Sequence, residues 1–188
     1  MNLQEAIYER RSVRKYTSQP VQREQILALL ENAVQAPSAM NKQPWAFVVI
    51  QDKERLKTYS DRAKEMLLSE MDQKPYLARY RSLFRNESYN IFYNAETLIV
   101  ILAKPQGPDP KTDCNLAAQN LMLAAHGMGL GTCWIGFAYP FLNRPEIKAE
   151  LGIPPEYHAV APVIVGYPEE PSRPVKRISP EIVTWVEA

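Results

Sequence analysis

The densest group of side chains able to do chemistry is the basic cluster ERRSVRKY near the N-terminus. It places the guanidiniums of Arg10, Arg11 and Arg14 and the hydroxyl of Ser12 within five residues. Arginine offers forked, permanently charged donors that match the oxygens of a phosphate. The cluster therefore predicts an anion-binding site. The alternative is a solvated basic surface at the end of a helix, where cations also suit the helix dipole.

A second group lies in the loop APSAMNKQPW, residues 36–45. Its two prolines stiffen a segment in which Ser38, Asn41 and backbone groups supply hydrogen-bond donors and acceptors. Such a loop is suited to reading the edge of a heterocycle. The alternative is an ordinary connection between a helix and a strand, built from turn-forming residues.

A third group is the glycine-rich segment GLGTCWIG, residues 129–136. The glycine spacing over residues 127–131 suggests a dinucleotide-binding fingerprint, but that fingerprint needs a strand before it and a helix after it. Here the Ala-rich residues 113–128 predict a helix before the glycines, and residues 132–136 predict a strand after them. We therefore interpret the glycines as a helix end and as a close approach of backbone to something flat.

A fourth group is the basic run RPVKR, residues 173–177. Together with the N-terminal cluster it would complete a clamp on a phosphate. The alternative is a solvated basic loop.

Other common catalytic arrangements are missing from the sequence. The two histidines, His126 and His158, have no acidic or cysteine partner at metal-ligand spacing, and we interpret His126 as structural. No nucleophile elbow and no phosphate-binding loop ending in Gly-Lys-Ser/Thr occurs. An enzyme without such groups relies on a cofactor for its chemistry.

Composition favours a globular cytoplasmic protein. The formal net charge of +1 gives no electrostatic case for binding nucleic acid or membranes. The sequence has neither an apolar run of about 18 residues nor a signal-peptide core. We interpret Cys114 and Cys133 as buried, reduced and inert.

The elements that position these groups follow from apolar periodicity. Helices are predicted over residues 3–10, 21–36, 52–71, 76–93, 113–128 and 140–151. Continuous apolar runs predict strands over 45–50, 97–103, 132–136 and 159–166, and a weak alternation suggests another over 182–186. Because the strands are apolar on both faces, we expect one domain over residues 1–188, with a mixed sheet covered by helices on each side.

The predicted helix over residues 76–93 is rich in aromatic side chains. These rings suit the wall of a site for flat aromatic substrates. The alternative is that they belong to the core or to a dimer contact. The number of apolar helical faces also favours burial against a second subunit.

Taken together, the four groups resemble the FMN-dependent nitroreductase family. The segments RRSVRKY, APSAMNKQPW and GLGTCWIG and the basic tail before EIVTW occur in the order that family shows. The resemblance runs from about Arg10 to the C-terminus, and the short length is similar to that of the small family members. It implies an α+β fold with a central mixed, mainly antiparallel sheet flanked by helices on both faces.

The resemblance also implies a cofactor site. FMN would bind non-covalently at the interface of a homodimer whose C-terminal segment reaches the partner subunit. The FMN-binding residues it implies are Arg10, Arg11, Ser12, Arg14, Lys176 and Arg177 for the phosphate and ribityl chain, Pro37, Ser38, Ala39 and Asn41 from the other subunit, and Cys133, Trp134, Ile135 and Gly136 beside the flavin ring. The backbone N–H groups of Ile135 and Gly136 would lie near flavin N5.

The implied activity is transfer of hydride from NAD(P)H through the flavin to an electron-poor acceptor, such as a nitroaromatic or a quinone, in a ping-pong cycle. Two alternatives stay open. One is a specialised reductase of the same fold, such as a dehalogenase, an enoate reductase or a flavin-fragmenting enzyme. The other is a flavin-binding or storage protein without efficient turnover.

Overall fold

The computed structural model describes residues 2–171, 173 and 175–187. The described helices are α1 (Leu3–Glu9), α2 (Arg23–Ala33), α3 (Lys53–Ser69), α4 (Arg81–Arg85), α5 (Pro110–Gly127), α6 (Ala138–Leu142) and α7 (Pro145–Glu150), with short 3₁₀ helices η1 (Ala39–Asn41) and η2 (Pro75–Tyr80). The strands are β1 (Trp45–Ile50), β2 (Thr97–Ala103), β3 (Gly131–Trp134) and β4 (His158–Gly166).

The helix starts follow from local capping. The side chain of Asn2 accepts a hydrogen bond from Glu5 N–H, and the Glu5 carboxylate accepts one from Asn2 N–H, forming a capping box at α1. Asp52 caps α3 and Asp109 caps α5 through backbone N–H groups of the first turn. These caps explain why α3 and α5 begin within three residues of the predicted starts.

The sheet has the strand order β1-β2-β4-β3, with antiparallel pairing between all neighbours. One parallel bridge, between Ser12 and Thr132, adds the N-terminal segment to the edge of β3. The expected mixed, mainly antiparallel sheet is confirmed. Strand β2 is buried along its whole length, which is why its sequence, TLIVILA, is apolar at nearly every position.

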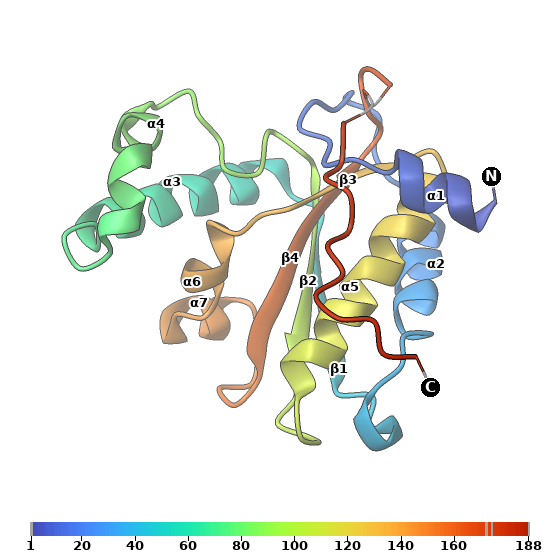
Figure 1. Ribbon diagram of the computed structural model, residues 1–188. Coiled ribbons are helices and arrows are strands. Elements are labelled where there is room, and N and C mark those ends of the chain that lie inside the picture. Colours follow the sequence, from blue (N-terminus) through green and yellow to red (C-terminus); the bar gives the residue numbers. More distant parts are fainter. Residues whose placement is uncertain (1, 172, 174, 188) are drawn as a thin grey trace.

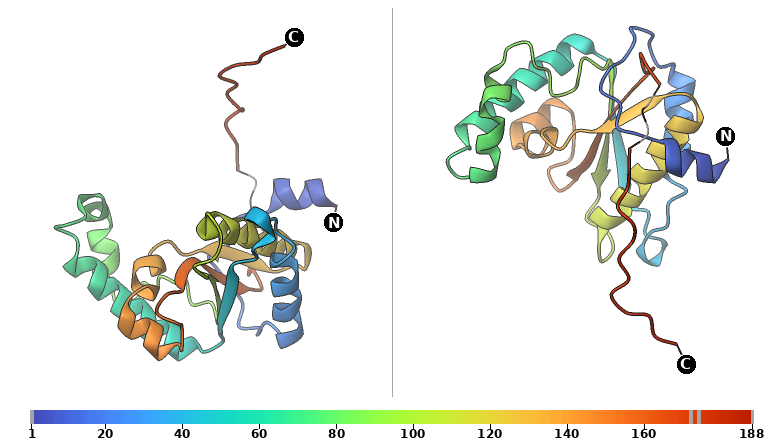
Figure 2. Two further views of the ribbon diagram at one scale, coloured as in Figure 1. Left: turned by 90° about the horizontal axis from the view of Figure 1, so that it is seen from below. Right: turned by 45° about the horizontal axis from the view of Figure 1, so that its top comes forward.

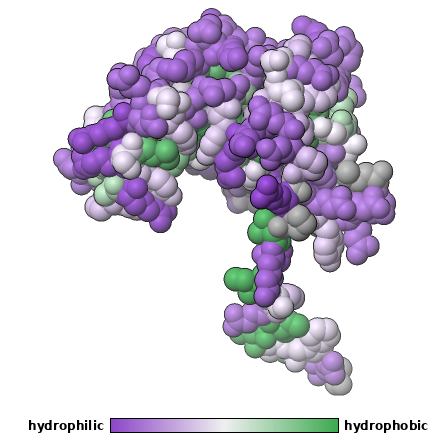
Figure 3. Space-filling model, turned by 90° about the horizontal axis from the view of Figure 1, so that it is seen from above, coloured by the Kyte–Doolittle hydropathy of each residue, from purple (hydrophilic) through white to green (hydrophobic). Residues whose placement is uncertain are grey.

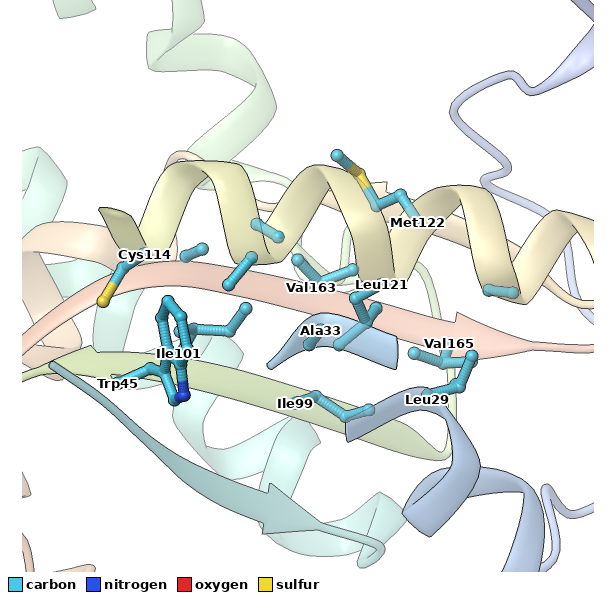
Figure 4. Close-up of a cluster of buried hydrophobic side chains, with 14 of the residues drawn as sticks. Leu29, Ala33, Trp45, Ile99, Ile101, Cys114, Leu121, Met122, Val163 and Val165 are labelled. Carbon is cyan, nitrogen blue, oxygen red and sulfur yellow. The ribbon is translucent and has the colours of Figure 1, made fainter. Parts of the chain in front are cut away.

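Helices cover both faces of the sheet (Figure 1). On one face α2 and α5 pack against β2 and β4; Figure 4 shows Leu29 and Ala33 of α2 meeting Leu121 of α5 over Ile99 and Val165. On the other face α3, α6 and α7 cover a second apolar cluster. The predicted helix–sheet–helix layering is confirmed.

Two predicted helices were wrong in extent. The helix predicted over residues 76–93 consists of η2 and α4 and ends at Arg85, where Asn86 is extended, with ψ 113°. The helix predicted over residues 140–151 is split into α6 and α7, because Pro145 forces the preceding Arg144 into an extended conformation with ψ 137°.

The predicted strand over residues 182–186 was also wrong. The described tail beyond residue 175 forms no strand, and its apolar side chains are exposed, Val183 to 89% and Trp185 to 72%. A strand needs a hydrogen-bonding neighbour, and none of the described strands pairs with this segment. Figure 2 shows the tail extending away from the body of the molecule, and Figure 3 shows apolar residues along it.

Candidate functional site

The N-terminal basic cluster follows directly after α1 and is held against the edge of β3. Val13 N–H donates to the carbonyl of Thr132 (2.9 Å). This approach requires Gly131, because a Cβ at that position would lie 2.7 Å from Cγ2 of Val13. The glycine that sequence patterns assigned to a close backbone approach therefore faces Val13, and it fixes the path of Arg10 to Arg14.

The cluster opens onto a hollow of about 410 Å³, here called the basic hollow. It is lined by Arg10, Arg11, Ser12, Val13, Arg14, Lys15, Glu170, Pro171, Arg173, Val175 and Arg177. Six of these side chains are cationic, and the only carboxylate among them, Glu170, pairs with Lys15 (3.6 Å). Burial lowers the pKa of Arg10, and the like charges of Arg11 and Arg177 lower it further. The hollow therefore carries an excess of positive charge that a phosphate would neutralise.

The two predicted residues in the tail differ in placement. Both side chains are exposed, but Arg177 lines the basic hollow and Lys176 does not. Side chains in an extended segment alternate between its two sides. Arg173 and Val175 line the hollow with Arg177, as that alternation requires.

The guanidinium of Arg11 is hydrogen-bonded to the protein backbone at one nitrogen and not at another. Its Nη1 donates to the carbonyls of Tyr8 (2.6 Å) and Arg10 (2.7 Å), closing the C-terminal end of α1. Its Nε is buried, and no described residue accepts a hydrogen bond from it. Arg11 is thus partly committed to the fold, while Arg10 and Arg177 form no ion pair with a described carboxylate.

A second hollow, of about 530 Å³, lies beside the first and is here called the aromatic hollow. It is lined by Arg14, Leu67, Lys74, Tyr76, Leu77, Arg79, Tyr80, Ile91, Tyr93, Cys133, Trp134, Ile135, Gly136, Phe137, Tyr139 and Pro140. Arg14 lines both hollows, so they meet at its side chain, which lies 5.7 Å from the ring centre of Tyr93. The aromatic wall expected from residues 76–93 is present in part: Tyr76, Tyr80 and Tyr93 line the hollow, whereas Phe84 and Phe92 are core residues.

The segment from Cys133 to Gly136 forms one wall of the aromatic hollow. Burial raises the pKa of the Cys133 thiol, and the positive charge of Arg14 partly opposes that rise. Ile135 N–H donates to the carbonyl of Pro162 (2.8 Å) and is engaged in the sheet. No described residue accepts a hydrogen bond from Gly136 N–H, and a Cβ at Gly136 would meet nothing within 4 Å. Of the two predicted amide donors, only Gly136 is free to serve a ligand.

The predicted residues Pro37, Ser38, Ala39 and Asn41 lie elsewhere. None of them lines either hollow. Their loop is fixed at the start of α5, where Ala39 N–H donates to Oδ1 of the buried Asp113 (3.1 Å). The basic cluster packs beyond the other end of this helix, which at 18 residues is about 27 Å long. Within one chain the structure does not bring the two groups together.

The same loop carries backbone strain. Met40, Asn41 and Gln43 all have positive φ, at 53°, 53° and 48°. Side chains other than glycine avoid this region, and such residues concentrate at functional sites. Sequence reasoning missed both this strain and the anchoring role of Asp113, which reads in sequence only as an acidic residue in a first helical turn.

The remaining groups offer no second centre among the described residues. No group of three or more potential metal ligands is present there, and both cysteines are free and buried. His126 lines a third hollow, of about 470 Å³, between α1 and the end of α5. None of the described helices is long and apolar enough to cross a membrane.

Comparison with known proteins identifies the family to which this fold belongs. The model of the nitroreductase family matches residues 7–167. The chain belongs to the nitroreductase family. This is a family of oxidoreductases, and the match includes the basic cluster, the 36–45 loop and the glycine-rich segment.

Relatives within the family are similar over most of their length. A protein of Archaeoglobus fulgidus named "Putative NADH dehydrogenase/NAD(P)H nitroreductase" is 34% identical over 170 residues, covering 87% of this chain and 84% of the relative. An NAD(P)H FMN reductase of Bacillus subtilis is 27% identical, covering 97% and 72%. The crystal structure of a Bacteroides fragilis nitroreductase with bound FMN superposes with a TM-score of 0.84 and 29% identity, covering all of both chains.

Proposed function

We propose that this family member binds FMN non-covalently and uses it to pass hydride from NAD(P)H to an electron-poor acceptor, such as a nitroaromatic or a quinone. The observation that carries the proposal is the pair of hollows joined at Arg14. One is cationic and fits a phosphate, and the other has aromatic walls and fits a flat ring. The FMN bound in the Bacteroides fragilis relative supports it.

The residues of the basic hollow suit the phosphate end of FMN. Arg10, Arg177 and the hydroxyl of Ser12 would hold the phosphate. Like-charged guanidiniums at this spacing repel one another without an anion, and an anion converts that repulsion into charge-assisted hydrogen bonds.

The residues of the aromatic hollow suit the flavin ring. Bound FMN would supply a hydride acceptor and donor at N5, the redox chemistry that no side chain of this protein provides. Gly136 N–H would donate toward N5, with Cys133 and Trp134 along the same wall. Arg14 would place a fixed positive charge at the ring and stabilise the negative charge that develops there on reduction.

A homodimer would complete the site. The loop with Pro37, Ser38, Ala39 and Asn41 lies about one α5 length from the basic cluster of its own chain. We therefore assign it to the site of the partner subunit. Leu3 and Ile7 of α1 are exposed apolar side chains suited to such an interface. The exposed C-terminal tail would pack across the partner.

The test is the visible spectrum of the purified protein and the chromophore released on denaturation. We expect the bands of oxidised flavin, about one FMN per chain, a dimer in solution, and NAD(P)H oxidation that depends on a nitroaromatic or quinone. A colourless protein that does not bind added FMN would overturn the proposal. Full FMN occupancy without turnover would instead indicate a flavin-storage protein, and turnover restricted to a halogenated or enoate acceptor would indicate a specialised reductase.

A further inference from the structure

Arg79 lines the aromatic hollow together with the segment from Cys133 to Gly136. It belongs to η2, and its guanidinium carbon lies 4.8 Å from the ring centre of Tyr80. Tyr80 in turn packs edge-on against Phe137, with ring centres 5.0 Å apart. Phe137 follows Gly136, so a short chain of stacked groups ties Arg79 to the segment proposed to contact flavin N5.

The charge of this hollow is one-sided. Its lining includes three cations, Arg14, Lys74 and Arg79, and no carboxylate. Lys74 is already paired with Glu70 (2.6 Å), and Arg14 lies at the junction with the basic hollow. No described carboxylate forms an ion pair with Arg79. Its charge is therefore free for a ligand that enters the hollow.

We propose that the preferred electron acceptor is a flat aromatic compound carrying a carboxylate, which Arg79 binds while the acceptor ring lies beside the flavin in the aromatic hollow. This proposal rests on the proposed function and specifies its substrate class. A guanidinium fork matches a carboxylate in two parallel hydrogen bonds. Stacking on Tyr80 holds the fork in place, which reduces the side-chain entropy lost on binding.

The discriminating probes are 4-nitrobenzoate and 4-nitrobenzamide, which share a ring and a nitro group but differ in charge. In each case NAD(P)H supplies the hydride and solvent a proton, and the nitro group becomes a nitroso group with loss of one water. The measured quantity is kcat/KM for the acceptor, because in a ping-pong cycle it reports only the oxidative half-reaction. The ratio of benzoate to benzamide then isolates recognition of the charge.

The variants are Arg79→Gln and the matched control Arg81→Gln. Arg81 carries the same charge two residues along the chain, but it faces Asp72 (3.9 Å) and lines a different hollow. We expect the wild-type ratio to favour benzoate, to fall at least tenfold in Arg79→Gln, and to stay within twofold in Arg81→Gln. Arg79→Lys should restore part of the ratio, and FMN content measured alongside excludes misfolding.

Several results would overturn the inference. One is a ratio near one in the wild type, and another is a ratio that Arg79→Gln leaves unchanged. A third is that NADPH reduces the Arg79→Gln enzyme more slowly while the ratio of benzoate to benzamide is unchanged. That result would assign Arg79 to binding the phosphates of the hydride donor. In each of these cases the neutral acceptor is still reduced, so the proposed function stands. If the holoprotein reduces neither acceptor, the flavin spectrum gives a second test. A spectrum perturbed by 4-nitrobenzoate but not by 4-nitrobenzamide would still support the role of Arg79, and an unperturbed spectrum would refute it. A protein without FMN refutes both proposals.

Discussion

Removing the charge of the Arg177 side chain should weaken FMN binding without lowering the stability of the apoprotein. Arg177 lines the basic hollow, and its charge lowers the pKa of Arg10. In the apoprotein these guanidiniums repel each other, so Arg177→Gln removes an unfavourable interaction. In the FMN complex the same substitution removes a charge-assisted hydrogen bond to the phosphate.

The size of the affinity loss follows from that hydrogen bond. A hydrogen bond to a charged group contributes roughly 1.5–3 kcal/mol, which is about a 10- to 150-fold change in Kd. Because Arg177 is exposed in the single chain, we expect the lower part of this range, about tenfold at 0.1 M salt, with a smaller effect as salt rises. The unfolding midpoint of the apoprotein should stay the same or rise.

The assay is fluorescence titration of the apoprotein with FMN and with riboflavin, which has no phosphate. Arg177→Gln should weaken FMN binding and leave riboflavin binding unchanged. The neighbouring Lys176→Gln is the matched control, because Lys176 does not line the hollow and should change neither. An equal loss for riboflavin, or an equal effect of the two substitutions, would refute the assignment of the basic hollow to the phosphate.

Three further predictions concern the scaffold. Gly131→Ala should destabilise the protein by about 1–3 kcal/mol in urea unfolding, because the added methyl group would lie 2.7 Å from the side chain of Val13. Gly127→Ala is the control and should leave stability unchanged, because a Cβ there would meet nothing within 4 Å. Lys64→Met should lower the free energy of unfolding by roughly 2 kcal/mol, since the buried ammonium donates to two backbone carbonyls in the loop after α4. Amide protection against hydrogen exchange should fall in that loop, and protection equal to wild type would contradict this. Burial, and then nearby lysines, lower the pKa of His158, so the unfolded chain binds a proton more readily than the folded one. Stability should therefore fall as pH drops through about 6.5, and His158→Gln should flatten that part of the pH profile of the unfolding midpoint.

The parts of the fold that sequence predicts well depend on local pattern. Residues 45–50 and 97–103 are continuous apolar runs, and both form strands with the predicted bounds. The helix after Asp109 ends at Gly127, two residues before the glycine-rich segment, and the strand after it starts at Gly131. In each case the signal and the structure lie within a few residues of each other.

The parts that sequence does not predict depend on distant contacts. The sequence predicts a helix that continues past Arg85 to residue 93. Instead, the ammonium of Lys64, from α3, donates to the carbonyls of Asn86 and Tyr89 and holds the segment as a loop. Tyr93 then takes a positive φ of 53° and lines the aromatic hollow. Nothing in the local pattern marks either contact.

The sequence names candidate residues for the site but does not give their arrangement in space. Spacing alone suggests that the basic clusters at Arg10 and Arg177 form one phosphate clamp but leaves solvated surface as the alternative, and the resemblance to a known family favours the clamp. The structure then places both on one hollow. The alternation that separates Arg177 from Lys176 becomes visible only once the tail is known to be extended.

The loop at residues 37–43 carries the argument for a second subunit. Three residues in it, Met40, Asn41 and Gln43, hold positive φ, and each such residue costs on the order of 1–3 kcal/mol unless the surroundings compensate. Buried Asp113 supplies part of that compensation through Ala39 N–H, and its Oδ2 has no described partner. A buried carboxylate oxygen that accepts no hydrogen bond is unfavourable, and so is a strained loop. Neither Asp113 nor the loop lines one of the two hollows of its own chain. Both would be explained if the loop is shaped for a ligand held by the other copy, which is why we propose that the complete site lies between two subunits.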